Sequence, residues 1–198
     1  MAMKILLFIV VALILGAFLF WWLLPHFLEQ PKYKVIDKQG DLEIRQYQQM
    51  LLTSITTKGA QREALGKGFV PLARYIGAKD RDGQKISMTA PVMQTQGDET
   101  GEWIVSFSMP SQYHSRTLPA AKNTDIFMRE FDPNLTAVSR FSGRATEQMF
   151  QEKAQRLNLW LQERGYIATS KPYYLFYNDP STPGFLRRNE VLYMVQNK

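Results

Sequence analysis

Three glutamates of this 198-residue chain stand in or beside segments of alternating polarity: Glu43, Glu130 and Glu190. A strand can point such a carboxylate into a cleft, where it is available as a general acid or base. The alternative is structural, because each glutamate has a neighbouring arginine with which it can pair on the rim: Arg45, Arg129 and Arg188. The sequence leaves both interpretations open.

The chain lacks the residues needed for other common catalytic and metal sites. The chain has no cysteine and only two histidines, His26 and His114, which excludes a zinc site and a serine triad of the usual composition. Asp80 begins a DRDG segment, but the twelfth position of a calcium loop falls on Pro91, where that loop needs a glutamate. We therefore predict no catalytic residues and no structural metal.

Large apolar side chains form a stronger signal than the charged ones. Aromatic and methionine residues are more numerous in the predicted strands than one face of a small barrel needs. Most of them belong to the core, but together they allow a site for a flat hydrophobic ligand. They are Phe107, Met109, Phe127, Phe131, Tyr173, Tyr174, Phe176, Tyr177, Tyr193 and Met194.

The segment KISMTAPVM, residues 85–93, begins as an alternating strand and then places a proline where a central strand needs a hydrogen-bond donor. It predicts a sheet edge or the rim of a pocket.

The elements that must position these residues occur twice. Tyr47 lies twelve residues before Gly59, and Phe131 lies twelve before Gly143, at the ends of similar strand pairs. An apolar stripe of helical spacing follows each pair, and strands close each half. The pattern predicts an α+β fold with a duplicated βαβ-type repeat and pseudo-twofold symmetry, in which two main helices pack on a curved antiparallel sheet or distorted barrel. The stripes are Leu65, Phe69, Leu72 and Ile76, then Phe150, Ala154, Leu157 and Leu161.

The N-terminal region has a composition suited to lipid and not to water. Ile5 to Leu24 is a run without charge, long enough to cross a hydrocarbon core, with Trp21 and Trp22 at one end. A cleaved signal peptide and a buried core helix are the alternatives to an uncleaved anchor. We expect residues 1–30 to form an anchor and linker, and residues 31–198 to form one domain with halves at about 33–118 and 119–198. Short N-terminal anchors favour a single-pass protein with its domain outside, although the lysines flanking the run do not decide the topology.

The net charge of +6 is dispersed, and Arg187 and Arg188 form the only adjacent basic pair. No helix carries a basic stripe, so we predict no nucleic-acid partner. The charge suits an anionic ligand and an anionic membrane surface.

Several segments together resemble the SOUL/haem-binding protein family, over about Tyr33 to Val195: LEIRQY, ARYIGAKDRDGQKISMTAPV, FSMPSQY, AVSRFSG and RRNEVLYMV. The resemblance implies the distorted barrel that bacterial effector-binding regulators also use, and an apolar cleft for haem or other tetrapyrroles. Members that ligate iron through histidine carry it in an EIRHY motif, where this chain has Gln46, a poor iron ligand. Other members hold haem through apolar contacts and a basic residue before YVG, a position that Arg74 occupies here.

We therefore interpret the chain as a membrane-tethered, non-enzymatic binding protein for haem or a similar flat amphipathic molecule. His114 is a candidate replacement ligand for the iron, because its loop follows the strand next to the KISMTAPVM segment. The residues expected to line or rim the site, with the arginines contacting propionates, are Val70, Leu72, Arg74, Met88, Pro91, Arg187 and Arg188.

Two other functions remain open. A small-molecule hydrolase using a cleft glutamate and a tyrosine predicts that Glu43 or Glu190 faces the cleft unpaired. A ligand-free interaction or structural protein predicts a cleft filled by the protein's own aromatic side chains. The sequence does not decide the ligand or the oligomeric state.

Overall fold

The computed structural model describes the backbone of residues 2–198 and the side chains of residues 3–20 and 28–198. Three helices, ten strands and a short 3-10 helix make up this part of the chain. In order they are α1 (Ala2–Phe27), β1 (Tyr33–Gln39), β2 (Leu42–Tyr47), β3 (Met50–Lys58), α2 (Gln61–Ile76), β4 (Val92–Gln96), β5 (Glu102–Ser108), β6 (Ile126–Phe131), β7 (Leu135–Phe141), α3 (Glu147–Glu163), β8 (Tyr166–Ala168), β9 (Tyr173–Phe176), η1 (Gly184–Leu186) and β10 (Asn189–Asn197).

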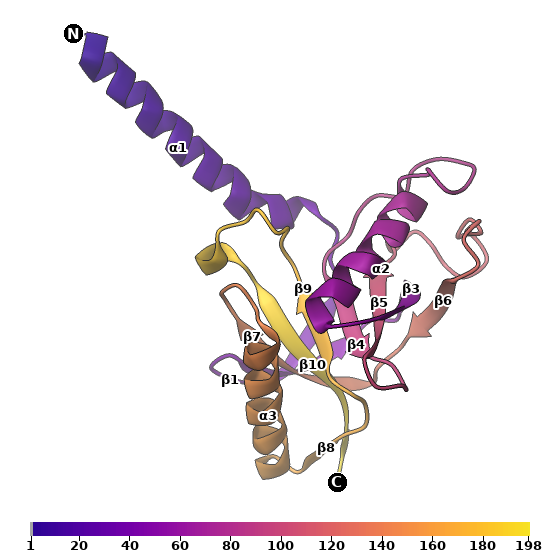
Figure 1. The fold of residues 1–198 in the computed structure, drawn as a ribbon. Coiled ribbons are helices and arrows are strands. Elements are labelled where there is room, and N and C mark those ends of the chain that lie inside the picture. The colour runs from indigo at the N-terminus through magenta and orange to yellow at the C-terminus, as the bar shows by residue number, and fades with distance from the viewer. Residues whose placement is uncertain (1) are drawn as a thin grey trace.

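The strands form one antiparallel sheet in the order β1-β2-β7-β10-β9-β4-β5-β3-β6, with β8 paired to β10 (Figure 1). The order is symmetric about the β9–β4 pair: β10 and β5, β7 and β3, and β2 and β6 stand at equal steps from it. Each half lends a strand to the other, since β2 pairs with β7 and β6 pairs with β3. The predicted α+β class with duplicated, pseudo-twofold architecture is confirmed.

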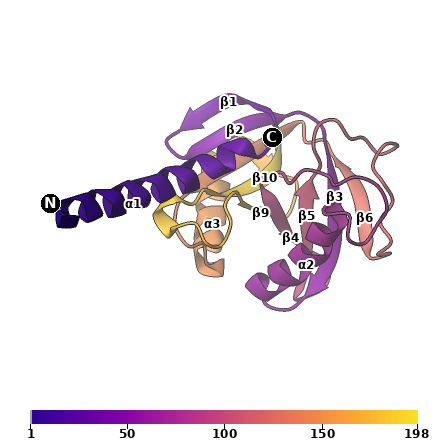
Figure 2. The ribbon, with the colours of Figure 1, turned by 90° about the horizontal axis from the view of Figure 1, so that it is seen from above.

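Helices α2 and α3 cover the same face of the sheet (Figure 2). The α3 stripe is buried as predicted, and Thr146 caps the helix by accepting a hydrogen bond from the Met149 backbone N–H at 3.2 Å. In α2, Leu72 and Ile76 are buried, whereas Phe69 is 39% exposed. Burying each large aliphatic side chain of these stripes stabilises the fold by about 1.5–3 kcal/mol.

Gly68 lets α2 approach the sheet closely. A Cβ atom at this position would lie 2.6 Å from Val105 of β5, so even alanine would force the helix and strand apart. The Gly68 backbone therefore fits where a side chain does not.

The prediction of an edge strand at residues 85–93 is wrong. The strand β4 begins only at Val92, and it is central, between β5 and β9. Residues before Pro91 form irregular chain, which explains why the proline removes no ladder hydrogen bond. The pocket-rim interpretation fits better, because Thr89 and Pro91 each line a cavity described below.

The N-terminal helix α1 projects from the domain (Figure 1), and its Met3–Phe20 window is long and apolar enough to cross a membrane. None of this window is buried, so the buried-core alternative is wrong. An uncleaved span and a signal sequence both have this character. The side chains of Trp21, Trp22 and His26 lie outside the described residues.

Candidate ligand-binding site

The sheet face opposite α2 and α3, which we call the inner face, is lined by apolar side chains from both halves. Leu52 and Met93 of the first half pack with Phe131, Leu175 and Leu192 of the second half. Between them remains a cavity of only about 10 Å³. The centre of the inner face is thus filled by the protein itself, in the manner expected of the ligand-free alternative.

A cluster of four charged residues, the ion cluster, lies on the second-half side of the inner face: Glu43, Arg45, Arg188 and Glu190. Glu190 is fully buried and accepts two hydrogen bonds from Arg45, at 2.9 and 3.1 Å. Arg188 donates two more, at 2.8 and 3.0 Å. The remaining Arg45 Nε–H bonds to Glu43 at 2.7 Å, so the buried charges are mutually satisfied.

Two tyrosines complete the ion cluster. The Tyr177 hydroxyl donates to Glu190 at 3.0 Å, and Arg45 donates to the Tyr47 hydroxyl at 3.0 Å. Burial and the nearby Glu190 carboxylate raise the pKa of both tyrosines above its usual value, so both remain neutral hydrogen-bonding groups at neutral pH.

The pKa of Glu43 is lowered. Burial acts to raise it, but hydrogen bonds and charge from Lys38 and Arg45 outweigh the burial. The hydrolase alternative required an unpaired glutamate, and Glu43 and Glu190 are both paired.

Residues 28–32, which we call the connecting segment, run from the end of α1 across the inner face. Leu28 packs against the inner-face apolar cluster, and the Glu29 carbonyl accepts a hydrogen bond from Ala90 N–H at 3.0 Å. The Glu29 carboxylate accepts another from Ser111 N–H at 2.7 Å. The segment is therefore a fixed part of the domain surface.

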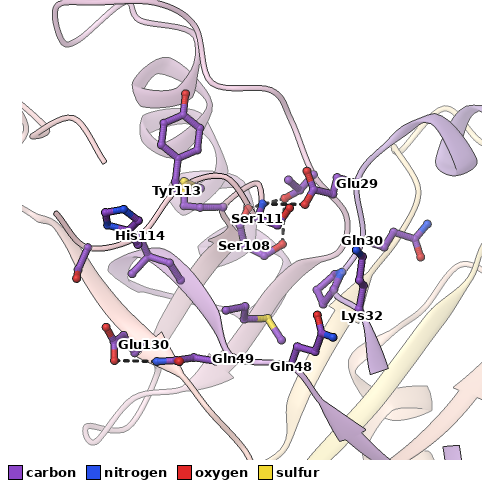
Figure 3. Close-up of a pocket in the computed structure, with 16 residues that line it drawn as sticks. Glu29, Gln30, Lys32, Gln48, Gln49, Ser108, Ser111, Tyr113, His114 and Glu130 are labelled. Carbon is purple, nitrogen blue, oxygen red and sulfur yellow. Dashed lines mark hydrogen bonds between the residues drawn. The ribbon is translucent and has the colours of Figure 1, made fainter. Parts of the chain in front are cut away.

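A larger cavity, of about 370 Å³, opens beside the connecting segment (Figure 3). Its walls come from the connecting segment, the β2–β3 turn, the end of β5 and the following loop, and β6. Figure 3 shows Gln49 bonded to Glu130 on one side and His114 at another. The lining residues are Glu29, Gln30, Pro31, Lys32, Gln48, Gln49, Met50, Leu51, Thr89, Ser108, Met109, Ser111, Tyr113, His114, Ser115 and Glu130.

The residues expected at the site do not converge on one surface. Val70, Leu72 and Arg74 belong to α2, and Met88 packs against the cluster beneath that helix. Pro91, by contrast, lines the small inner-face cavity.

Leu72 is fully buried against the sheet, while Val70 is 58% exposed on the opposite side of the helix. Leu72 thus stabilises the core and is closed to a ligand in this structure.

The three arginines proposed for propionates already bond to the protein. Arg74 makes two hydrogen bonds of 2.6 Å to Asp80, and Arg187 donates to the Thr182 carbonyl at 2.7 Å. Arg188 belongs to the ion cluster, and its guanidinium lies 3.7 Å from the Tyr177 ring centre.

His114 is the expected residue that lines the larger cavity. Gln46, at the family histidine position, is exposed on β2 opposite Lys34 and lines neither cavity.

Sequence reasoning missed most of the cavity wall. Glu29 and Lys32 fall in what reads as a linker, and Gln48 and Gln49 fall in a turn. The available signal was the polar EQPK segment, residues 29–32, which is separated by four residues from the end of the apolar run Ile5 to Leu24.

A comparison with known families decides the relationship. The family model described as SOUL heme-binding protein matches residues 28–194. This chain belongs to the SOUL haem-binding family. Heme-binding protein 2 of Homo sapiens and that of Mus musculus are each 28% identical to it over 180 residues, covering 85% of this chain and 86% of theirs.

Solved structures share the fold at low sequence identity. The EcmrR C-terminal domain superposes with a TM-score of 0.59 at 12% identity, covering 84% of this chain and 99% of that one. A hydrolase from Listeria innocua has a TM-score of 0.56 at 10% identity, covering 81% and 94%. At such identities the likeness concerns the fold alone, and it supports the effector-binding-like architecture of this SOUL family member.

The donor set of the larger cavity is compatible with haem. His114 carries an imidazole, Met50 carries a thioether, and both are side chains that ligate haem iron in proteins. Lys32 supplies a cation that can pair with a carboxylate.

Proposed function

We propose that this chain is a membrane-tethered, non-catalytic binding protein for haem or a similar flat amphipathic tetrapyrrole, with the ligand in the cavity beside His114. The observation that carries the proposal is this cavity of about 370 Å³, which lies in the size range of small-molecule sites and holds an imidazole. The centre of the inner face is too full to compete, with about 10 Å³ of space.

The roles of the wall residues follow from their chemistry. Haem, when bound, supplies an iron that accepts nitrogen or sulfur ligands. His114 would bind it through a ring nitrogen, and Met50 would offer apolar surface or a second donor. Lys32 would pair with a propionate carboxylate, because Arg74, Arg187 and Arg188 already bond to protein oxygen atoms.

The non-catalytic part of the proposal is supported by the pairing of the glutamates. Glu43 and Glu190 hold ion pairs, and Glu130 bonds to Gln49, so each carboxylate already accepts a hydrogen bond. A buried carboxylate that accepts charged hydrogen bonds is a poor base, because protonation would break those bonds.

We propose residues 1–30 as the tether, uncleaved, and residues 31–198 as the binding domain on the extracytoplasmic side. Single cysteines report this orientation, since the chain has no natural cysteine. A Leu159→Cys variant in intact cells should react with a membrane-impermeant maleimide. If the cysteine reacts with the maleimide only after the cells are lysed, the domain lies on the cytoplasmic side and the proposed orientation is wrong.

The test of ligand binding is a haemin titration of the full chain in detergent micelles, followed by Soret absorbance, with His114→Ala beside it. We expect saturable binding by the wild type, and a shifted Soret band with weaker binding for His114→Ala. Arg116→Ala, a change two residues away at a position that does not line the cavity, should behave as the wild type. A wild type that does not bind haemin would refute the proposal and favour the ligand-free alternative.

A further inference from the structure

We propose that the loop of residues 180–187, the Phe185 loop, inserts into the same lipid bilayer that holds α1. The inference rests on the proposed membrane tether and adds a second contact between the domain and lipid. It assigns a partner to an apolar side chain that the domain leaves open to solvent.

Phe185 is 66% exposed, although phenylalanine is among the side chains that gain most from leaving water. The described side chain that stacks on it belongs to α1: the Phe18 and Phe185 ring centres lie 5.6 Å apart. In Figure 1 the segment that leads into the yellow strand β10 passes beside the end of α1 nearest the domain.

The position of Phe18 in α1 sets the depth of the loop. Phe18 lies inside the Met3–Phe20 window that is apolar enough to span a membrane. Phe18 lies six residues before Leu24, the last residue of the apolar run Ile5 to Leu24, and at a helical rise of 1.5 Å per residue this is about 9 Å. If α1 spans the bilayer, a ring stacked on Phe18 lies at the level of the acyl chains.

The loop is held in shape, as an inserting element must be to present one side chain. Arg187 donates hydrogen bonds to the carbonyls of Thr182 and Pro180, and Gly143 N–H donates to the Gly184 carbonyl at 3.0 Å. These bonds fix both the base of the loop and its contact with the 142–144 turn.

Charge around the loop fits phospholipid headgroups. Arg144 is exposed, and its Cγ atom would lie 3.3 Å from a Cβ placed on Gly184, so this arginine flanks the tip. An aromatic tip with an exposed arginine at its base matches the layering of a membrane interface, with the ring among acyl chains and the cation among phosphates.

The absence of cysteine makes the depth of the loop measurable at single sites. Phe185→Cys, Phe18→Cys and Leu159→Cys variants of the full chain are labelled with the fluorophore NBD in phosphatidylcholine–phosphatidylglycerol vesicles. Lipids carrying a spin label on the acyl chain then quench any fluorophore among the chains. Leu159 is the control, because it is 62% exposed on α3, a helix that packs on the sheet.

We expect NBD at positions 18 and 185 to show blue-shifted emission and strong quenching, and NBD at position 159 to show neither. Quenching at 18 without quenching at 185 would keep the tether and overturn the inserted loop. No quenching at 18 or 185 would overturn both proposals. Blue-shifted emission at 185 without lipid quenching would point to a protein partner at this loop and also overturn the inference.

Discussion

The ion cluster and the cavity beside His114 differ in how they use polar groups. In the ion cluster, Glu190 and Arg45 are almost completely buried, and their charged atoms bond to each other and to neighbours. In the cavity beside His114, polar side chains surround about 370 Å³ of open space. The filled ion cluster can stabilise the fold but has no room for a ligand, whereas the cavity has that room.

The pseudo-twofold symmetry repeats this contrast at two arginines. Arg129 stands two residues before Phe131 as Arg45 stands two before Tyr47, and both point to the inner face. Among the described residues, no carboxylate pairs with Arg129, and its buried Nε has no hydrogen-bond partner. Its contacts are a 3.3 Å bond to Ser106 and the Tyr173 ring at 5.7 Å. Arg45 therefore stabilises the fold through its ion pairs, whereas Arg129, at the equivalent position, makes only weak contacts.

The largest expected effect follows from breaking the ion cluster. Arg45→Gln leaves the buried Glu190 carboxylate short of a partner and should lower the free energy of unfolding by about 3–5 kcal/mol. Arg129→Gln removes no ion pair and should change it by less than about 1 kcal/mol. Urea denaturation of the full chain in micelles, followed by tryptophan fluorescence, measures both. Equal losses in the two variants would contradict the contrast between the halves.

A smaller effect is expected where the connecting segment, residues 28–32, forms one wall of the cavity. Glu29→Ala removes the 2.7 Å hydrogen bond to Ser111 N–H and should loosen this wall. The loss of a charged hydrogen bond is worth about 1–2 kcal/mol, which corresponds to about tenfold faster haemin release. Transfer of haemin to apomyoglobin reports the release rate. The control is Glu99→Ala, which removes an exposed carboxylate that pairs with Lys58. Equal haemin release rates in the two variants would show that residues 28–32 do not contribute to the site.

The smallest expected effect is the loss of folding stability at low pH through Glu43. The pKa of Glu43 is lower in the folded chain than in the unfolded one, so its contribution to stability is complete above the unfolded pKa and is lost as pH falls through the folded pKa. Between pH 7 and pH 3 the wild type should lose about 1 kcal/mol or less more than Glu43→Gln does. Haemin binding by the cavity should not share this difference. Identical pH profiles of unfolding for the two proteins would argue against a folded-state ion pair at Glu43.

Local patterns predicted the fold because each carried its own physical signal. The twelve-residue spacings that end at Gly59 and Gly143 and the two apolar helical stripes are visible in short windows. The segment at residues 85–93 was misjudged because its strand is central only through pairing with β9, which lies in the other half of the chain. The sequence near Pro91 contains no pattern that predicts such non-local pairing.

The ion pairs show the same limit. The structural alternative, pairing with a neighbouring arginine, is confirmed for Glu43 with Arg45 and for Glu190 with Arg188, because residues two apart on a strand share a face. It was wrong for Glu130 with Arg129, because adjacent residues point to opposite faces, and Glu130 bonds to Gln49 instead. The expected rim position was wrong too, since Glu190 is fully buried.

The cavity itself could not be predicted, since its walls come from segments distant in sequence. His114 was identified only as the histidine of a loop near the right strand. The hydrogen bond between Glu29 and Ser111 joins two segments far apart in sequence, and neither segment contains a pattern that predicts it.

The most direct test of the account compares two space-filling variants in the same haemin titration. Ser111→Trp places an indole in the cavity, and Val70→Trp places one on the exposed side of α2, where the family resemblance implied the ligand. We predict that Ser111→Trp weakens haemin binding at least tenfold, about 1.4 kcal/mol, and that Val70→Trp leaves it unchanged. Loss of binding in Val70→Trp with normal binding in Ser111→Trp would contradict the account and put the ligand on the α2 surface.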